Sequence, residues 1–139
     1  NDLNYISCDR TELELANPGY YARGMDYAAQ HMLEGHKADA VAVTLGHEGA
    51  KLYMRDTEVT GYPKHAVPVH IPAFNDHAVD RIGAGDAWFG WTAPLIRAGA
   101  PIEVVAFVGA CAAAVHVSTV GNDAAKKNEV HGFMRSILS

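Results

Sequence analysis

Three small residues before a carboxylate, Gly83-Ala84-Gly85-Asp86, form the segment of this 139-residue chain that is best suited to chemistry. Small residues leave their backbone N–H groups uncovered, and the start of a helix adds partial positive charge at the same place. Such an arrangement binds anions, phosphate in particular. A carboxylate beside phosphate repels it, unless its task is to accept a proton from an attacking hydroxyl. Gly83, Ala84 and Gly85 are therefore candidates for an anion hole, and Asp86 for a catalytic base.

The same segment also has a purely structural interpretation. Glycine-rich helix starts are common in proteins of many functions. An aspartate in the first turn can simply cap the helix, and the glycines can simply turn the chain. On spacing alone, both interpretations stay open.

Apolar and helical segments alternate along the chain, which predicts an α/β fold with a mainly parallel sheet flanked by helices. Residues 39–45 form a nearly continuous apolar run, typical of a strand buried on both faces. Ligands bind such sheets beyond the carboxyl ends of the strands. This rule points to the turns at residues 46–49 and 83–86. Strands are expected at residues 3–8, 39–45, 50–55, 67–71 and 78–80, and helices at residues 11–15, 20–34, 83–98, 101–117 and 131–138. Residues 50–55 are expected to be the return strand of a hairpin, and Asp9 or Thr11 to cap the first helix. One face of the second helix is expected to carry its apolar side chains, Met25, Ala28, Ala29, Met32 and Leu33.

Composition limits the class of protein and its partners. With 49% apolar and 19% charged residues, the chain is typical of one globular domain. A net charge of −5 argues against a nucleic-acid partner. No signal peptide is visible, and residues 102–117, the most apolar stretch, are too short for a membrane span. Cys8 and Cys111 are expected to be buried free thiols of a reducing compartment. Together these features predict a cytoplasmic protein without a membrane partner.

The segment around Asp86 resembles a signature of the ribokinase-like (PfkB) carbohydrate kinases, commonly written D-T-x-G-A-G-D. It stands here as Asp80-Arg81-Ile82-Gly83-Ala84-Gly85-Asp86. Asp9-Arg10-Thr11-Glu12 resembles the family's N-x-x-E motif, and Thr44-Leu45-Gly46-His47-Glu48-Gly49 resembles its T-x-G-x-x-G nucleotide loop. The V-D-R-I-G-A-G-D run and the later V-G-N-D resemble kinase domains of the heptose-phosphate-kinase-like branch.

The resemblance implies that ATP, with Mg²⁺, donates its γ-phosphate to a hydroxyl of a sugar or sugar phosphate. By this resemblance, Asp86 is the base, and the backbone of residues 83–85 binds the γ-phosphate. Glu12 is expected to act near Mg²⁺ through water. Residues 109–114 and the turn at 120–122 are expected to border the adenine. The ATP-binding residues implied by the resemblance are Thr44, Gly46, Gly49 and Asn122.

Ribokinase-like kinases are much longer than this chain, which resembles their C-terminal half. Residues 1–139 are therefore expected to form a single partial domain, the nucleotide-binding and catalytic portion of a sugar kinase. The missing N-terminal half would supply the sugar pocket, so the fragment alone is expected to be inactive. Sheet edges and apolar faces that this half normally covers would favour a homo-oligomer.

Four residues depart from the family's pattern, since Asp9 replaces Asn, Arg81 replaces Thr, Trp91 replaces a small residue and Cys111 replaces Asn. None of them removes Asp86 or the anion hole. They keep two alternatives open, a non-catalytic nucleotide-binding or degenerate kinase fragment and a structural fragment with vestigial sites. His47, inside the nucleotide loop, is expected to face solvent.

Overall fold

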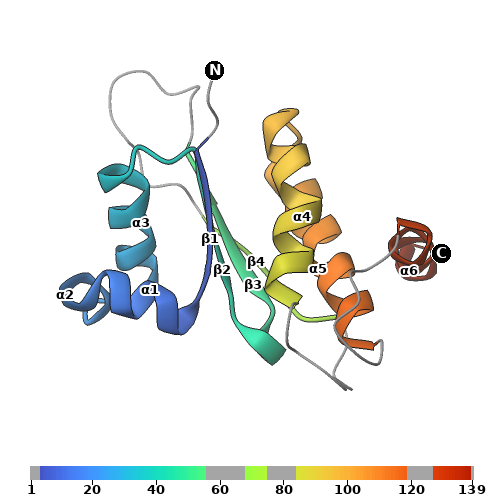
Figure 1. Cartoon of the computed structure of the whole chain (residues 1–139), viewed down its shortest axis with the longest axis horizontal. Coiled ribbons are helices and arrows are strands. Elements are labelled where there is room, and N and C mark those ends of the chain that lie inside the picture. Colours follow the sequence, from blue (N-terminus) through green and yellow to red (C-terminus); the bar gives the residue numbers. More distant parts are fainter. Residues whose placement is uncertain (1–3, 56–67, 75–83, 119–126, 139) are drawn as a thin grey trace.

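The computed structural model describes residues 4–55, 68–74, 84–118 and 127–138. In these ranges a four-stranded sheet lies between two groups of helices (Figure 1). The strands, in their order across the sheet, are β1 (Tyr5–Asp9), β2 (Ala40–Thr44), β3 (Ala50–Met54) and β4 (Val69–Ile71). One face is covered by α1 (Arg10–Ala16), α2 (Pro18–Tyr21) and α3 (Met25–Gly35). The other face is covered by α4 (Ala84–Arg97) and α5 (Ile102–Ser118), and α6 (Lys127–Leu138) packs on α5.

The predicted α/β class is confirmed, but the described sheet is mixed and not mainly parallel. β1 and β2 run parallel, because the helices α1 to α3 cross over between them. β2 and β3 run antiparallel, because only the short 3₁₀ turn Gly46–Glu48 joins them. β3 and β4 are also antiparallel. The hairpin itself was predicted from the sequence, yet apolar runs alone do not reveal strand direction.

Helix boundaries differ from the prediction at two places. The single helix expected over residues 20–34 is divided, since α2 ends at Tyr21 and α3 begins at Met25. Gly24 between them has a φ of 122°, which a continuous helix does not allow. α6 begins at Lys127 and not at residue 131. The short strand expected at residues 78–80 and the turn expected at 120–123 lie outside the described residues.

β2 contributes side chains to apolar cores on both faces of the sheet. Val41 and Val43 pack against the α3 side, whereas Ala40 and Ala42 pack against the α4 and α5 side. All four side chains are fully buried. This confirms the prediction of a strand covered on both faces. On the predicted face of α3, Ala28, Ala29, Met32 and Leu33 are buried, and Met25 is half-buried against the same core.

α4 and α5 pack closely because Gly109 of α5 has no side chain. A β-carbon there would lie 2.5 Å from the ring of Trp88 and 2.7 Å from the methyl group of Thr92. Tyr5 links β1 to α4. Its hydroxyl lies 2.8 Å from Thr92 Oγ1 and accepts a hydrogen bond from Trp88 Nε1 at 3.0 Å. These contacts hold the first turns of α4, which include Asp86, against the sheet.

Both cysteines are free and buried, as predicted. Burial raises the pKa of each thiol, Cys8 and Cys111, to about 11, so both stay protonated at neutral pH. Among the described helices, none has the length and apolar character that crossing a bilayer requires.

Candidate functional site

The carboxyl ends of β1 and β2 bring two of the predicted motifs to one edge of the sheet. The two strands are parallel and in register, so Asp9 pairs with Thr44. β1 leads directly into α1, and β2 leads into the turn that contains Gly46 and Glu48. Both connections therefore leave the sheet at the edge where α/β folds bind their ligands.

A cleft of about 620 Å³ opens at this edge. Small-molecule sites typically enclose roughly 300–1,000 Å³, so the cleft has a suitable size. Its walls come from the ends of β1 and β2, the segment after β4, the start of α4 and the middle of α5. Predicted site residues that line it are Glu12, Thr44, Gly46, Gly49, Ala84, Gly85 and Asp86. The remaining two, Gly83 and Asn122, lie outside the described residues.

Asp86 is exposed in the first turn of α4, at the wall of the cleft. α4 has 14 residues, so the dipoles of its peptide groups direct partial positive charge toward this end. In the part of the chain that the structure describes, no hydrogen bond or ion pair engages the Asp86 carboxylate. No described side chain therefore competes with a ligand for this carboxylate. The alternative that Asp86 only caps α4 stays open, because Gly83, the residue before this helix, lies outside the described residues.

Gly85 and Thr44 bring the start of α4 into contact with the end of β2. A β-carbon on Gly85 would lie 3.9 Å from Thr44 Oγ1, an ordinary van der Waals distance. The Thr44 hydroxyl in turn donates a hydrogen bond to the carbonyl oxygen of Cys8, at 3.5 Å. The ends of two strands and the start of a helix thus converge on one part of the cleft.

Asp9, one of the two predicted candidates, caps α1 and does so together with Glu12. The backbone N–H of Glu12 donates to Asp9 Oδ1 at 2.8 Å, and the backbone N–H of Asp9 donates to Glu12 Oε1 at 3.0 Å. This reciprocal pair satisfies two N–H groups at the helix start. Asp9, the departure from the family's usual Asn, therefore has a structural task at the rim of the cleft.

The described wall of the cleft is acidic. Asp9, Glu12 and Asp86 contribute carboxylates, and no lysine or arginine is among the described residues that line it. Within the described ranges, however, no three potential metal ligands lie close enough together to hold an ion by themselves. Mg²⁺ commonly binds through one or two carboxylates, with water and substrate phosphates completing its shell. The carboxylates here fit a cation of that kind.

The turn after β2 depends on glycine at both ends. Gly46 has a φ of 60° and Gly49 a φ of 94°, both in the left-handed region. A β-carbon at Gly49 would also lie 1.9 Å from the carbonyl oxygen of Ile71. Backbone packing therefore requires glycine at position 49, whether or not a ligand is bound. Around Gly46 the space is open.

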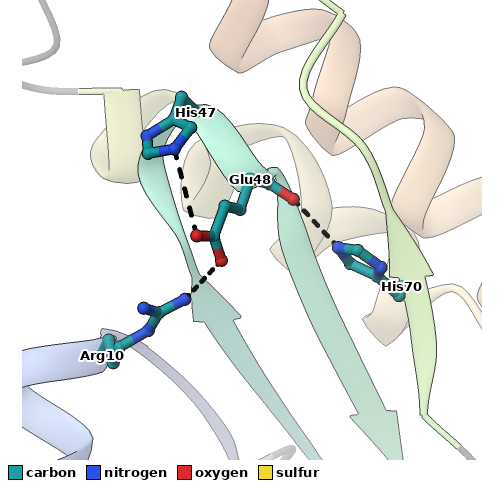
Figure 2. Close-up of polar contacts among 4 residues, drawn as sticks. All are labelled: Arg10, His47, Glu48 and His70. Atoms are coloured by element: carbon teal, nitrogen blue, oxygen red, sulfur yellow. Dashed lines mark hydrogen bonds and ion pairs between the residues drawn. The ribbon is translucent and has the colours of Figure 1, made fainter.

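Glu48 connects this turn to α1 and to β4 (Figure 2). Its carboxylate accepts a hydrogen bond from Arg10 Nη2 at 2.7 Å, and its backbone carbonyl accepts one from His70 Nε2 at 2.9 Å. Hydrogen bonding and attraction from Arg10 lower the pKa of the Glu48 carboxyl. The side chain of His47 is 75% exposed, which confirms that it faces solvent.

Two of the other departures from the family's pattern take part in packing. Trp91 lies edge-on to His131 of α6, with 6.0 Å between the ring centroids. Cys111 is fully buried in the core between α5 and α6. Neither residue lines the cleft. Arg81 lies outside the described residues.

The part of the wall that follows β4 was not predicted from the sequence. Pro72, Ala73 and Phe74 line the cleft there. Their residue types carry no chemical signal, and only the pairing of β4 with β3 brings them to this edge. Ala110, Ala113 and Ala114 of α5 also line the cleft, within the segment expected to border a nucleobase.

Sequence comparison finds related kinases, although no protein-family model matches the chain. A deoxyribokinase of Salmonella typhi is 36% identical over 97 aligned residues, which cover 64% of this chain and 28% of that protein. A deoxyribokinase of Salmonella typhimurium matches equally well. The chain thus spans less than a third of the length of these curated relatives.

Comparison with solved structures finds the same fold in several kinases. A ribokinase of Thermotoga maritima superposes with a TM-score of 0.76 at 26% identity, over 96% of this chain and 42% of that one. Phosphofructokinase-2 of Escherichia coli gives a TM-score of 0.75 at 17% identity, over 99% of this chain and 42% of that one. An Arabidopsis thaliana ribokinase complexed with ribose and ATP gives a TM-score of 0.73 at 22% identity, over 95% of this chain and 41% of that one.

Proposed function

Since this chain belongs to the ribokinase-like (PfkB) family of carbohydrate kinases, we propose that the kinase of which it forms a part moves the γ-phosphate of ATP to a hydroxyl of a sugar or sugar phosphate. The observation that carries the proposal is the convergence of Glu12, Thr44 and Asp86 on one cleft. These residues come from three separate motifs, and the fold brings all three to the same edge of the sheet.

Asp86 is the base in this proposal. As the acceptor oxygen bonds to phosphorus, the bond between phosphorus and the leaving ADP oxygen breaks, and the hydroxyl proton passes to the Asp86 carboxylate. The N–H groups of Ala84 and Gly85 at the start of α4, together with that of Gly83 in the proposal, stabilise the negative charge of the transferring group. The exposure of Asp86 at the cleft wall supports this role, because the acceptor must reach it.

ATP would lie between the turn after β2 and α5. Thr44, Gly46 and Gly49 are assigned to its phosphates and ribose, with Asn122 beyond the described residues. Ala110 and Ala113 leave room for a flat base on the α5 side. Mg²⁺, when bound, neutralises charge on the phosphates. Glu12 would hold it through water, since Glu12 Oε1 already accepts the N–H of Asp9.

We also propose that residues 1–139 are one partial domain, the C-terminal, nucleotide-binding portion of a larger kinase. The chain matches only 42% of the ribokinase structure, which supports this view. The residues that select the sugar would lie in the remainder, so the acceptor is proposed only as a class. Cytoplasmic location, self-association and the heptose-phosphate-kinase-like branch remain predictions from the sequence.

The test is release of ADP from Mg·ATP by the complete protein, across a panel of sugars, sugar phosphates and nucleosides. Release that depends on one class of sugar supports the kinase and identifies its acceptor. A protein that binds Mg·ATP but releases ADP with no acceptor would support the alternative, a non-catalytic nucleotide-binding or degenerate kinase fragment. A protein that binds no Mg·ATP would overturn both.

A further inference from the structure

Arg10 and Glu48 connect two separate motifs. Each residue stands at a position where its motif specifies no residue type. Arg10 follows Asp9 in the segment Asp9-Arg10-Thr11-Glu12, and Glu48 precedes Gly49 in the turn after β2. The two residues are 38 positions apart in the sequence. In the structure Arg10 Nη2 donates to Glu48 Oε2 at 2.7 Å, directly between α1 and the turn (Figure 2).

The pair contributes little to stability. The side chains of Arg10 and Glu48 are 46% and 50% exposed. Exposed ion pairs generally add little to folding, since water solvates both partners well. Such a pair can still fix the position of the two segments that it connects, which here are α1 and the turn after β2.

The connected groups lie at the same cleft. α1 begins at Arg10, and Glu12 in its first turn lines the cleft. The turn that carries Glu48 also carries Gly46 and Gly49, which line the cleft as well. On its other side the turn is held to β4 by the hydrogen bond from His70 to the Glu48 carbonyl. Among the described residues, Arg10 is thus a side-chain link from this turn to α1.

We propose that Arg10 and Glu48 are positioning residues that fix the turn after β2 relative to Glu12, so that both can engage the same Mg·ATP. The inference rests on the proposed function. Neither residue touches substrate in this account. Loss of the pair would let the turn move relative to α1 and weaken binding of Mg·ATP, while the chemical step at Asp86 would be preserved.

The test compares variants of the complete protein that keep the same total charge at the two positions. The double variant Arg10→Ala with Glu48→Ala removes both charges and the link. The exchanged variant Arg10→Glu with Glu48→Arg keeps both charges and can restore the link in reverse. Glu14→Ala is the control, because Glu14 is exposed on α1 and does not line the cleft. The measurements are the dissociation constant for Mg·ATP by calorimetry, kcat, and Tm.

We expect the double alanine variant to bind Mg·ATP about fivefold more weakly, the most that an exposed pair usually supplies. The exchanged variant should recover to within about twofold of wild type by the same reasoning. kcat and Tm should change little in either variant, and the control should match wild type.

Three results would overturn the inference. The first is a double alanine variant that binds Mg·ATP as well as wild type does. The second is an exchanged variant that binds as weakly as the double alanine variant. The third is weaker binding that is accompanied by an equal loss of kcat or by a large fall in Tm, since this would indicate a structural role. These results leave the proposed function intact, whereas a wild-type protein that binds no Mg·ATP removes both.

Discussion

Asp9 and Glu12 each accept the other's backbone N–H, at 2.8 Å and 3.0 Å, where β1 ends and α1 begins. This reciprocal cap orients Glu12 at the cleft, the position proposed for a carboxylate near Mg²⁺. The position of Glu12 therefore depends on a neighbour that belongs to the same short motif.

Replacing Asp9 with alanine should destabilise the protein by about 1 kcal/mol, because the cap on the Glu12 N–H is lost. Asp9→Asn keeps an oxygen that accepts this N–H and should stay within about 0.5 kcal/mol of wild type. Urea denaturation of both variants measures the difference. Equal stability of the alanine and asparagine variants would show that the cap contributes nothing.

Gly49→Ala should destabilise the fold by about 2–4 kcal/mol, because a β-carbon would meet the Ile71 carbonyl oxygen at 1.9 Å and a positive φ would be forced on alanine. Gly46→Ala is the matched control, since its φ is also positive but the space around it is open. It should cost only about 1 kcal/mol. Denaturant midpoints of the two variants measure these losses of stability. Equal losses would show that contact with the Ile71 carbonyl adds no cost at position 49.

Thr92→Val should cost about 1–2 kcal/mol, although valine has the same shape. The Thr92 hydroxyl donates to the Trp88 carbonyl at 2.8 Å and accepts from the Tyr5 hydroxyl, so valine leaves a largely buried hydroxyl proton without an acceptor. Thr92→Ser restores the hydroxyl and should recover most of the hydrogen-bond contribution. If thermal melts show valine to be as stable as threonine, the network that links β1 to α4 is not stabilising.

Asp26 should make stability sensitive to acid. The hydrogen bond from the Tyr53 hydroxyl, with a further one from Lys51, lowers the pKa of Asp26 below its ordinary value of 3.8. A lowered folded-state pKa stabilises the fold above the unfolded pKa, and this contribution is lost as the pH falls through the folded value. Asp26→Asn should therefore be less stable than wild type near neutral pH, and the difference should shrink below about pH 4. Urea midpoints of both proteins across this pH range measure the difference in stability. A difference that grew in acid would contradict the prediction.

The parts of the fold that were predicted correctly are those with a local signal. The apolar run at β2, the amphipathic face of α3 and the cap at Asp9 each follow from neighbouring residues alone. Seven residues that the family resemblance implies for the site line one cleft, and the rule for strand ends pointed to two of the turns that carry them. Their roles stay predictions.

The missed features depend on contacts between distant parts of the chain. The mixed direction of the sheet follows from the length of each connection, which apolar runs do not encode. The segment of Pro72 to Phe74 reaches the cleft only through β4 pairing, and Arg10 meets Glu48 only after β1 and β2 have aligned. Arg10 and Glu48 stand at motif positions that specify no residue type, so the sequence offered no reason to pair them.

The most direct test of the account replaces Asp86 with asparagine in the complete protein and measures kcat together with the dissociation constant for Mg·ATP. Removal of a general base should lower kcat by about 10²- to 10⁴-fold, whereas binding of Mg·ATP should not weaken. Asp26→Asn, the same change on the opposite face of the sheet, should leave both values near wild type. An Asp86→Asn enzyme that keeps the wild-type kcat would contradict the role of Asp86 as general base, and so would one that has lost its affinity for Mg·ATP.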